Sequence, residues 1–195
     1  MPGDQLTLFS RPSSSTLPEG FLYHPDAISA GEEERLLAEI APLPFKEFQF
    51  HGFEGKRRVV SFGWRYDYAQ HKALPADPIP DFLRDVCRNV QDASGFHIRD
   101  LEQVLVTEYA PGAPIGWHKD RPVYGNVMGL SLASPCTFRL RKRDGDGPWQ
   151  RLSLRLEPRS AYFLSGAARW TWEHSIPPVD ALRYSITFRD RRSDD

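Results

Sequence analysis

The second half of this chain is a series of short segments in which apolar and polar residues alternate, separated by turns rich in glycine, proline and aspartate. Apolar side chains at every second position are typical of a strand with one buried face. The segments expected to form strands are 101–109, 127–132, 137–141, 152–156, 161–164, 170–176 and 184–188. Many short strands of this kind favour a β-barrel or a double-sheet jelly roll.

The first half of the chain mixes helical and strand patterns. Ser29 and Glu32 form a capping-box pattern ahead of an apolar stripe, which indicates where a helix begins. A second apolar stripe closes before Gly95, a residue typical of helix ends. The expected elements are a helix over 30–41, strands over 45–50 and 59–68, and a helix over 80–93.

Length and composition exclude several classes of protein. The chain has 195 residues, enough for one domain with a substantial core. No apolar run is long enough to span a bilayer, and the N-terminus has no secretory pattern. Cys87 and Cys136 stand far apart, so we expect no disulfide scaffold, no disulfide-linked partner and no cysteine-clustered zinc site. These features predict a cytoplasmic protein without membrane contact.

Charge gives no general attraction to nucleic acid, because the net charge is −1. The basic residues are nevertheless 20 arginines and only 5 lysines. The planar arginine fork binds carboxylates and phosphates through two parallel hydrogen bonds. The base composition of the genome is the alternative explanation for the excess of arginine. An arginine is therefore a candidate for function only where its position in the sequence supports one.

Two of the six histidines stand in a His-x-Asp tripeptide. His24-Pro-Asp26 precedes a helix cap, and its residues are typical of a turn. His118-Lys-Asp120 follows a strand and a Pro/Gly-rich turn. In extended backbone, side chains two residues apart face the same side, so His118 and Asp120 can address one point. A third ligand would complete the two-His-one-carboxylate triad that holds Fe(II).

His174 is the candidate for that third ligand, because it lies on a late strand of the expected barrel. A hydrogen-bonded structural histidine is the alternative. The last strand adds a further indication, since its two faces differ in polarity. One face carries Tyr184, Ile186 and Phe188, and the other carries Arg183, Ser185, Thr187 and Arg189. If this polar face lines the interior of the barrel, the arginine at each end would suit a small dianion. The other interpretation is that the polar face points outward to solvent.

Taken together and in this order, these pieces resemble the AlkB-type family of Fe(II)/2-oxoglutarate-dependent dioxygenases. The matching stretches are Tyr109-Ala-Pro-Gly-Ala, His118-Lys-Asp120, 127–132, His174 and Arg183-Tyr-Ser-Ile-Thr-Phe-Arg189. The resemblance implies an α+β, mainly β fold with a double-stranded β-helix (jelly-roll) core. Residues 1–20 contain a serine run and three prolines without periodicity, which predicts a mobile tail. The rest is expected to form one catalytic domain over 21–195, with helices and a β-rich substrate lid over 21–98 and the core over 99–190.

The resemblance also implies the roles of individual residues. His118, Asp120 and His174 would bind iron and carry catalysis. Arg183 would hold the distal carboxylate of 2-oxoglutarate with help from the Tyr109 hydroxyl.

The same resemblance implies that Arg189 lies near the cosubstrate atoms that would chelate iron. Family members commonly carry Asn where Thr107 and Ser185 stand, so the hydrogen bonds to the cosubstrate are expected to differ here.

The implied reaction uses Fe(II), 2-oxoglutarate and O2 to remove an alkyl group from a base of nucleic acid or of a nucleotide, releasing formaldehyde, succinate and CO2. Trp64, Tyr66 and Trp117 are candidates for stacking on the base, with core packing as the alternative. Arg141 and Arg143 are candidates for phosphate contacts, with a solvated hairpin end as the alternative. The same chemistry on a protein or a small molecule, or a binding module with a dead iron site, stays open. A monomer is the default expectation.

Overall fold

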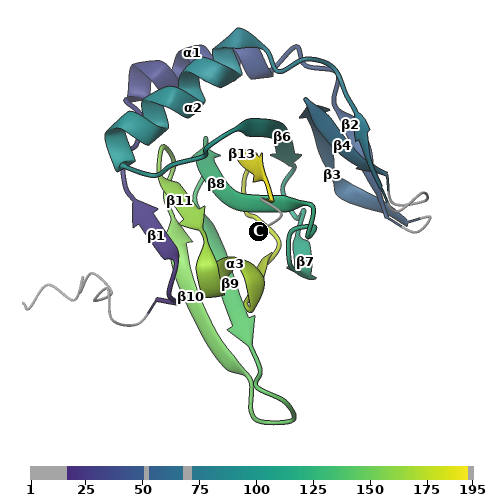
Figure 1. The fold of residues 1–195 in the computed structure, drawn as a ribbon. Coiled ribbons are helices and arrows are strands. Elements are labelled where there is room, and N and C mark those ends of the chain that lie inside the picture. Colours follow the sequence, from purple (N-terminus) through teal and green to yellow (C-terminus); the bar gives the residue numbers. More distant parts are fainter. Residues whose placement is uncertain (1–16, 51–52, 68–71, 193–195) are drawn as a thin grey trace, which may run out of the picture.

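The computed structural model describes residues 17–50, 53–67 and 72–192. Most of its strands form two antiparallel sheets (Figure 1). The seven-stranded sheet contains, in spatial order, β1 (Phe21–His24), β11 (Ala161–Leu164), β8 (Tyr124–Leu132), β13 (Arg183–Arg191), β6 (Leu101–Tyr109), β3 (Phe53–Phe62) and β2 (Lys46–Phe50). The four-stranded sheet contains β10 (Gln150–Leu156), β9 (Cys136–Lys142), β12 (Glu173–Ile176) and β7 (Ile115–His118).

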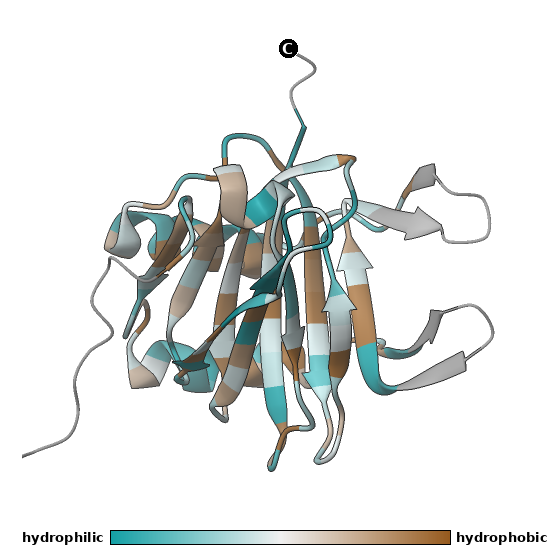
Figure 2. Ribbon diagram, turned by 90° about the horizontal axis from the view of Figure 1, so that it is seen from below, coloured by the Kyte–Doolittle hydropathy of each residue, from teal (hydrophilic) through white to brown (hydrophobic). Residues whose placement is uncertain are grey.

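From β6 to β9 the chain passes from one sheet to the other with every strand, as in a double-stranded β-helix. Inward-facing side chains of both sheets, such as Val127, Phe138, Leu140 and Leu164, meet in one buried cluster. The expected jelly-roll core is confirmed. Figure 2 shows hydrophobic and hydrophilic bands that alternate along the strands, the pattern expected where one face of each sheet is buried.

Two helices cover the outer face of the seven-stranded sheet (Figure 1). They are α1 (Ala30–Ile40) and α2 (Asp81–Ser94), close to the predicted ranges. Ser29 Oγ accepts from the backbone N–H of Glu32, whose carboxylate accepts from the backbone N–H of Ser29, so the capping box is confirmed. Gly95 ends α2 with a φ of 73°, a conformation that glycine adopts without steric cost.

Two sequence predictions differ from the structure. The strand expected over 59–68 is divided at Gly63 into β3 and β4 (Trp64–Asp67), which pairs with β5 (Lys72–Pro75). A Cβ at Gly63 would lie 2.2 Å from the carbonyl oxygen of Glu102, so only glycine fits there.

The strand expected over 170–176 is wrong in its first half. Residues Gly166–Trp170 form the short helix α3, and β12 begins only at Glu173. Strands β1, β5 and β7 were not predicted at all. Cys87 and Cys136 are both buried free thiols. Among the described residues, no helix has the length and apolar character needed to cross a membrane.

Candidate active site

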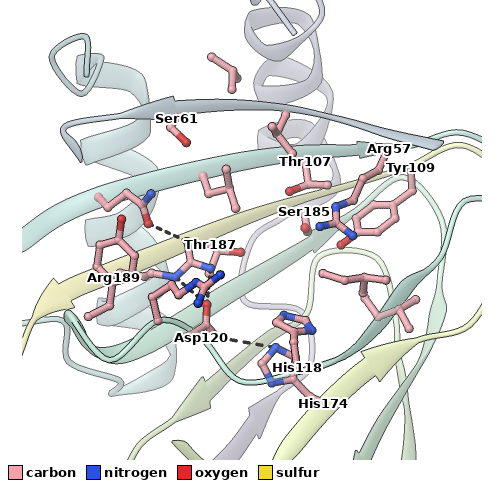
Figure 3. A pocket seen from close by; sticks show the side chains of 18 of the residues that line it. Arg57, Ser61, Thr107, Tyr109, His118, Asp120, His174, Ser185, Thr187 and Arg189 are labelled. Carbon is pink, nitrogen blue, oxygen red and sulfur yellow. Dashed lines mark hydrogen bonds and ion pairs between the residues drawn. The ribbon is translucent and has the colours of Figure 1, made fainter. Parts of the chain in front are cut away.

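His118 and His174 lie opposite each other on neighbouring strands of the four-stranded sheet, because β7 and β12 pair with these two residues in register. Their ring centroids are 4.2 Å apart. Asp120 follows two residues after His118, and its Oδ2 lies 3.6 Å from His174 Nε2. Figure 3 shows the three side chains gathered at one end of the cavity. The three residues selected from the sequence therefore meet.

The protonation of this group suits metal binding. Burial, and then the neighbouring His118, lowers the pKa of His174 to about 3, and burial also lowers the pKa of His118. Burial alone would raise the pKa of Asp120, but the charge of Arg189 and the adjacent imidazoles outweigh it and lower that pKa. The site thus holds two neutral imidazoles and an ionised carboxylate at neutral pH, the forms that bind metals.

Hydrogen bonds orient two of these side chains. His118 Nδ1 lies 2.8 Å from the carbonyl oxygen of Gly116, and a proton on Nδ1 leaves the lone pair of Nε2 for a metal. Arg189 donates from Nε and Nη2 to Asp120 Oδ1, and from Nη1 to Gln103 Oε1 at 2.7 Å. Asp120 Oδ2 is left on the side of His174.

Arg183 is the most unusual charged residue of the site. It is 1% exposed, and its Nη2 donates to Ser131 Oγ at 3.1 Å. Nε and Nη1 have no hydrogen-bond partner among the described residues, and the guanidinium lies over the Tyr109 ring, 5.0 Å from its centroid. A buried cation with two free donors is costly unless an anion pairs with it. Arg183 is therefore suited to a carboxylate.

One cavity of about 1270 Å³ joins these groups. Its lining includes the residues expected to hold metal and cosubstrate, which are His118, Asp120, His174, Tyr109, Thr107, Arg183, Ser185 and Arg189. Pockets for drug-sized ligands measure roughly 300–1,000 Å³. The cavity is larger, so it has room for a substrate group beside a small dicarboxylate.

The predicted substrate contacts are only partly brought together. Trp117 lines the cavity, whereas Trp64, Arg141 and Arg143 do not. The side chain of Tyr66 lies outside the described residues. Trp64 leaves the cavity wall because the chain turns at Gly63, directly before it.

Arg141 and Arg143 belong instead to an arginine–tryptophan ladder of Arg139, Trp117, Arg141, Trp149 and Arg143. Each guanidinium lies over a neighbouring indole, at 5.0, 4.4, 4.2 and 5.2 Å from the ring centroid along this order. On β9, Arg139 and Arg141 alternate with the buried Phe138 and Leu140, so this part of the ladder lies on the outer face of the four-stranded sheet. Through Trp117 it borders the cavity.

Several cavity residues were not found from the sequence. Gln103 and Leu105 share a face of β6 with Thr107 and Tyr109, so the alternation of that strand could have identified them. Tyr162 gave no local signal, because only strand pairing brings it to the cavity.

A jelly roll that carries two histidines and a carboxylate beside a buried arginine defines the class of Fe(II)/2-oxoglutarate oxygenases. The chain belongs to the 2OG-Fe(II) oxygenase superfamily, whose family model matches residues 39–189.

Within that superfamily the relatives are of the AlkB type. The chain is 31% identical over 167 residues to the alpha-ketoglutarate-dependent dioxygenase alkB homolog 7, mitochondrial, of Bos taurus, covering 83% of this chain and 69% of the relative. It is 25% identical over 146 residues to the alpha-ketoglutarate-dependent dioxygenase AlkB of Escherichia coli, covering 65% of this chain and 66% of the relative.

It is also 26% identical over 205 residues to the alkylated DNA repair protein ALKBH8 homolog of Arabidopsis thaliana. That match covers 92% of this chain but spans only 57% of the length of the relative. The solved structure of OsALKBH1 has the same fold, with a TM-score of 0.69 at 14% identity, covering 88% of this chain and 97% of that one.

The family implies Fe(II), 2-oxoglutarate and O2. The chemical types of the residues that line the cavity suit the metal and the cosubstrate. The donor set is two neutral imidazoles and a carboxylate, and the free donors of Arg183 suit a cosubstrate carboxylate. Within the described parts of the chain, no three His, Cys, Asp or Glu side chains are already arranged closely enough to hold an ion. The fit therefore rests on the chemistry and proximity of the donors.

Proposed function

We propose that this protein is a dioxygenase that removes alkyl groups oxidatively from the bases of nucleic acid or nucleotides. The observation that carries the proposal is the buried guanidinium of Arg183, whose Nε and Nη1 lack partners in the described structure, in the same cavity as the His118, Asp120 and His174 side chains. A pocket with an unpaired cation and three metal-type donors matches a metal bound together with a dicarboxylate.

Each group has a defined task in this proposal. His118, Asp120 and His174 hold the metal, and Arg189 fixes the carboxylate of Asp120. Arg183 binds the distal carboxylate of 2-oxoglutarate, with Tyr109 beside it. Thr107 and Ser185 stand side by side on paired strands and supply small polar groups to the cavity wall. Bound Fe(II) and 2-oxoglutarate together supply oxidation by O2, with release of succinate and CO2.

Two features support a nucleic-acid substrate. The relatives include a protein named for the repair of alkylated DNA. The arginine–tryptophan ladder offers both stacking rings and positive charge at the border of the cavity, the combination that binds unpaired strands. Arg141 is already paired with Glu173 through Nε and Oε2 at 2.6 Å, so the exposed Arg143 is the better candidate for a phosphate. The monomeric state and the cytoplasmic location also stay predictions.

The test is formaldehyde release from methylated single-stranded DNA and RNA, measured with Fe(II) and 2-oxoglutarate. We expect His118→Ala, Asp120→Ala and His174→Ala to lose bound iron and turnover together. His24→Ala alters the other His-x-Asp tripeptide and should leave both unchanged. Full activity in Asp120→Ala would overturn the metal assignment. Succinate formation that no oligonucleotide stimulates would instead favour a protein or small-molecule substrate.

A further inference from the structure

Tyr162 places a hydroxyl in the cavity that the proposed assignment has not used. The residue lies on β11, is 8% exposed and lines the same cavity as the metal-type donors. Its ring stacks on Phe21 at 6.3 Å between centroids and packs against Phe138 at 4.9 Å. The hydroxyl makes no hydrogen bond to any residue that the structure describes, and it is not among the fully buried atoms that lack a partner, so it is open to the cavity.

Gly129 makes room for this ring. It lies opposite Tyr162 on the paired strand β8, and a Cβ there would lie 2.3 Å from ring atoms Cε1 and Cζ and 2.6 Å from the hydroxyl oxygen. No positive φ requires a glycine at this position. A glycine inside a strand weakens it, and often marks a close approach of another group. Here the approaching group is the phenol ring of Tyr162.

Strand pairing places the Tyr162 hydroxyl between Arg183 and Arg189, two of the arginines that line the cavity. Gly129 pairs with Thr187 on β13. Two positions away along β8 in one direction, Ser131 pairs with Ser185, and two positions away in the other direction, Val127 pairs with Arg189. Arg183 is anchored at the Ser131 pair, because its Nη2 donates to Ser131 Oγ. Same-face positions along a strand are about 6.6 Å apart. Tyr162 thus reaches over the middle of the stretch that the two guanidiniums enclose.

The phenol is a hydrogen-bond donor under ordinary conditions. Burial raises the pKa of Tyr162, and the carboxylate of Asp120 adds to that effect. The protonated hydroxyl therefore offers one O–H to an acceptor in the cavity. The oxygens of a dicarboxylate bound between the arginines are acceptors of this kind.

We propose that the Tyr162 hydroxyl donates a hydrogen bond to bound 2-oxoglutarate, and that Gly129 is required because it admits the ring. This inference rests on the proposed function, since it assumes the same cosubstrate between Arg183 and Arg189. The competing explanation is that the ring only covers the strand glycine and packs the core, in which case the hydroxyl is dispensable.

Equilibrium binding of 2-oxoglutarate separates the two explanations without turnover. It is measured by calorimetry on the full chain loaded with Mn²⁺, which binds the same kinds of donor. Tyr162→Phe keeps the ring and removes only the hydroxyl, so we expect affinity to fall about 10- to 100-fold, the range for a hydrogen bond to a charged group. Metal content and melting temperature should stay close to those of the wild type. Tyr23→Phe, on the neighbouring strand β1 and outside the cavity lining, is the matched control and should bind normally.

Gly129→Ala should also weaken binding by displacing the ring, and Tyr162→Phe decides the question if that variant fails to fold. A Tyr162→Phe affinity within about twofold of the wild type overturns the role of the hydroxyl while leaving the proposed function intact. A wild-type protein that binds no 2-oxoglutarate overturns both. Loss of binding in Arg183→Ala together with weakened binding in Tyr162→Phe supports both.

Discussion

Replacing Arg169 by alanine should destabilise the protein and loosen the loop that carries Asp120. Arg169 lies in α3, is 2% exposed, and donates to four backbone carbonyl oxygens between residues 120 and 125. The distances are 2.6 Å to Gly125, 3.3 Å to Asp120, 2.8 Å to Arg121 and 2.7 Å to Tyr124. A helix of only five residues thus anchors the segment after β7 together with the first residues of β8.

The magnitude follows from these four bonds. Each hydrogen bond to a charged group contributes about 1.5–3 kcal/mol, but water entering the vacated space would satisfy some of the carbonyls. We therefore expect a loss of about 3–5 kcal/mol in the free energy of unfolding. For a chain of this length, that corresponds to a fall of about 10 °C in melting temperature. Because the backbone of Asp120 is among the acceptors, metal affinity should fall about 10- to 100-fold as well.

The assay is thermal and urea unfolding of the metal-free protein, with metal affinity measured separately. Arg192→Ala is the matched control, because the exposed Arg192 lies over the Trp170 ring at 5.1 Å, the same ring that Arg169 faces at 4.3 Å. The control should change stability by less than about 0.5 kcal/mol. If Arg169→Ala were as mild as this control, the loop would not depend on the buried guanidinium and the reasoning would be refuted.

Three further predictions concern stability. The pKa of His174 is about 3 in the folded protein against 6.5 for an ordinary histidine, so the unfolded chain binds more protons between these values. The metal-free protein should thus lose stability as pH falls from about 6.5 toward 3, a slope that urea unfolding at several pH values measures and that His174→Gln should reduce. Glu33→Ala should cost about 2–4 kcal/mol in urea unfolding, because the buried carboxylate accepts from the backbone N–H of Ala133 at 2.8 Å and from Arg159 Nη1 at 3.0 Å; a loss below about 0.5 kcal/mol would contradict this. Ser29→Ala should cost about 1 kcal/mol by removing the capping box, and an unchanged melting temperature would show that the cap is dispensable.

The local patterns of the sequence predicted much of the fold and the group of metal-type donors. Strand alternation places Arg183 and Arg189 on the cavity side of β13, because side-chain direction in a strand depends only on the parity of the position. The start of α1 was predicted from the Ser29 and Glu32 capping-box pattern, and the range 161–164 of β11 was also predicted. Such features need only neighbours along the chain.

The errors fall where distant contacts decide the outcome. Trp170 and Trp172 suggested a strand by alternation, but Arg169 bonds to the loop after β7 and keeps Gly166–Trp170 helical. A helix this short has little stability of its own, so no local signal marks it. The carbonyl of Glu102 against Gly63 divides the expected strand in the same way, and with it moves Trp64 away from the cavity.

By itself, the sequence determined the strand and helix faces and the types of donor that face inward, because these follow from periodicity and side-chain chemistry. Only the tertiary structure decided that His174 lies against His118, that Arg183 retains two unpaired donors, and that the Tyr162 ring enters over Gly129. The physical reason is that strand pairing across long stretches of chain sets these distances, and burial then sets the charge state of each group.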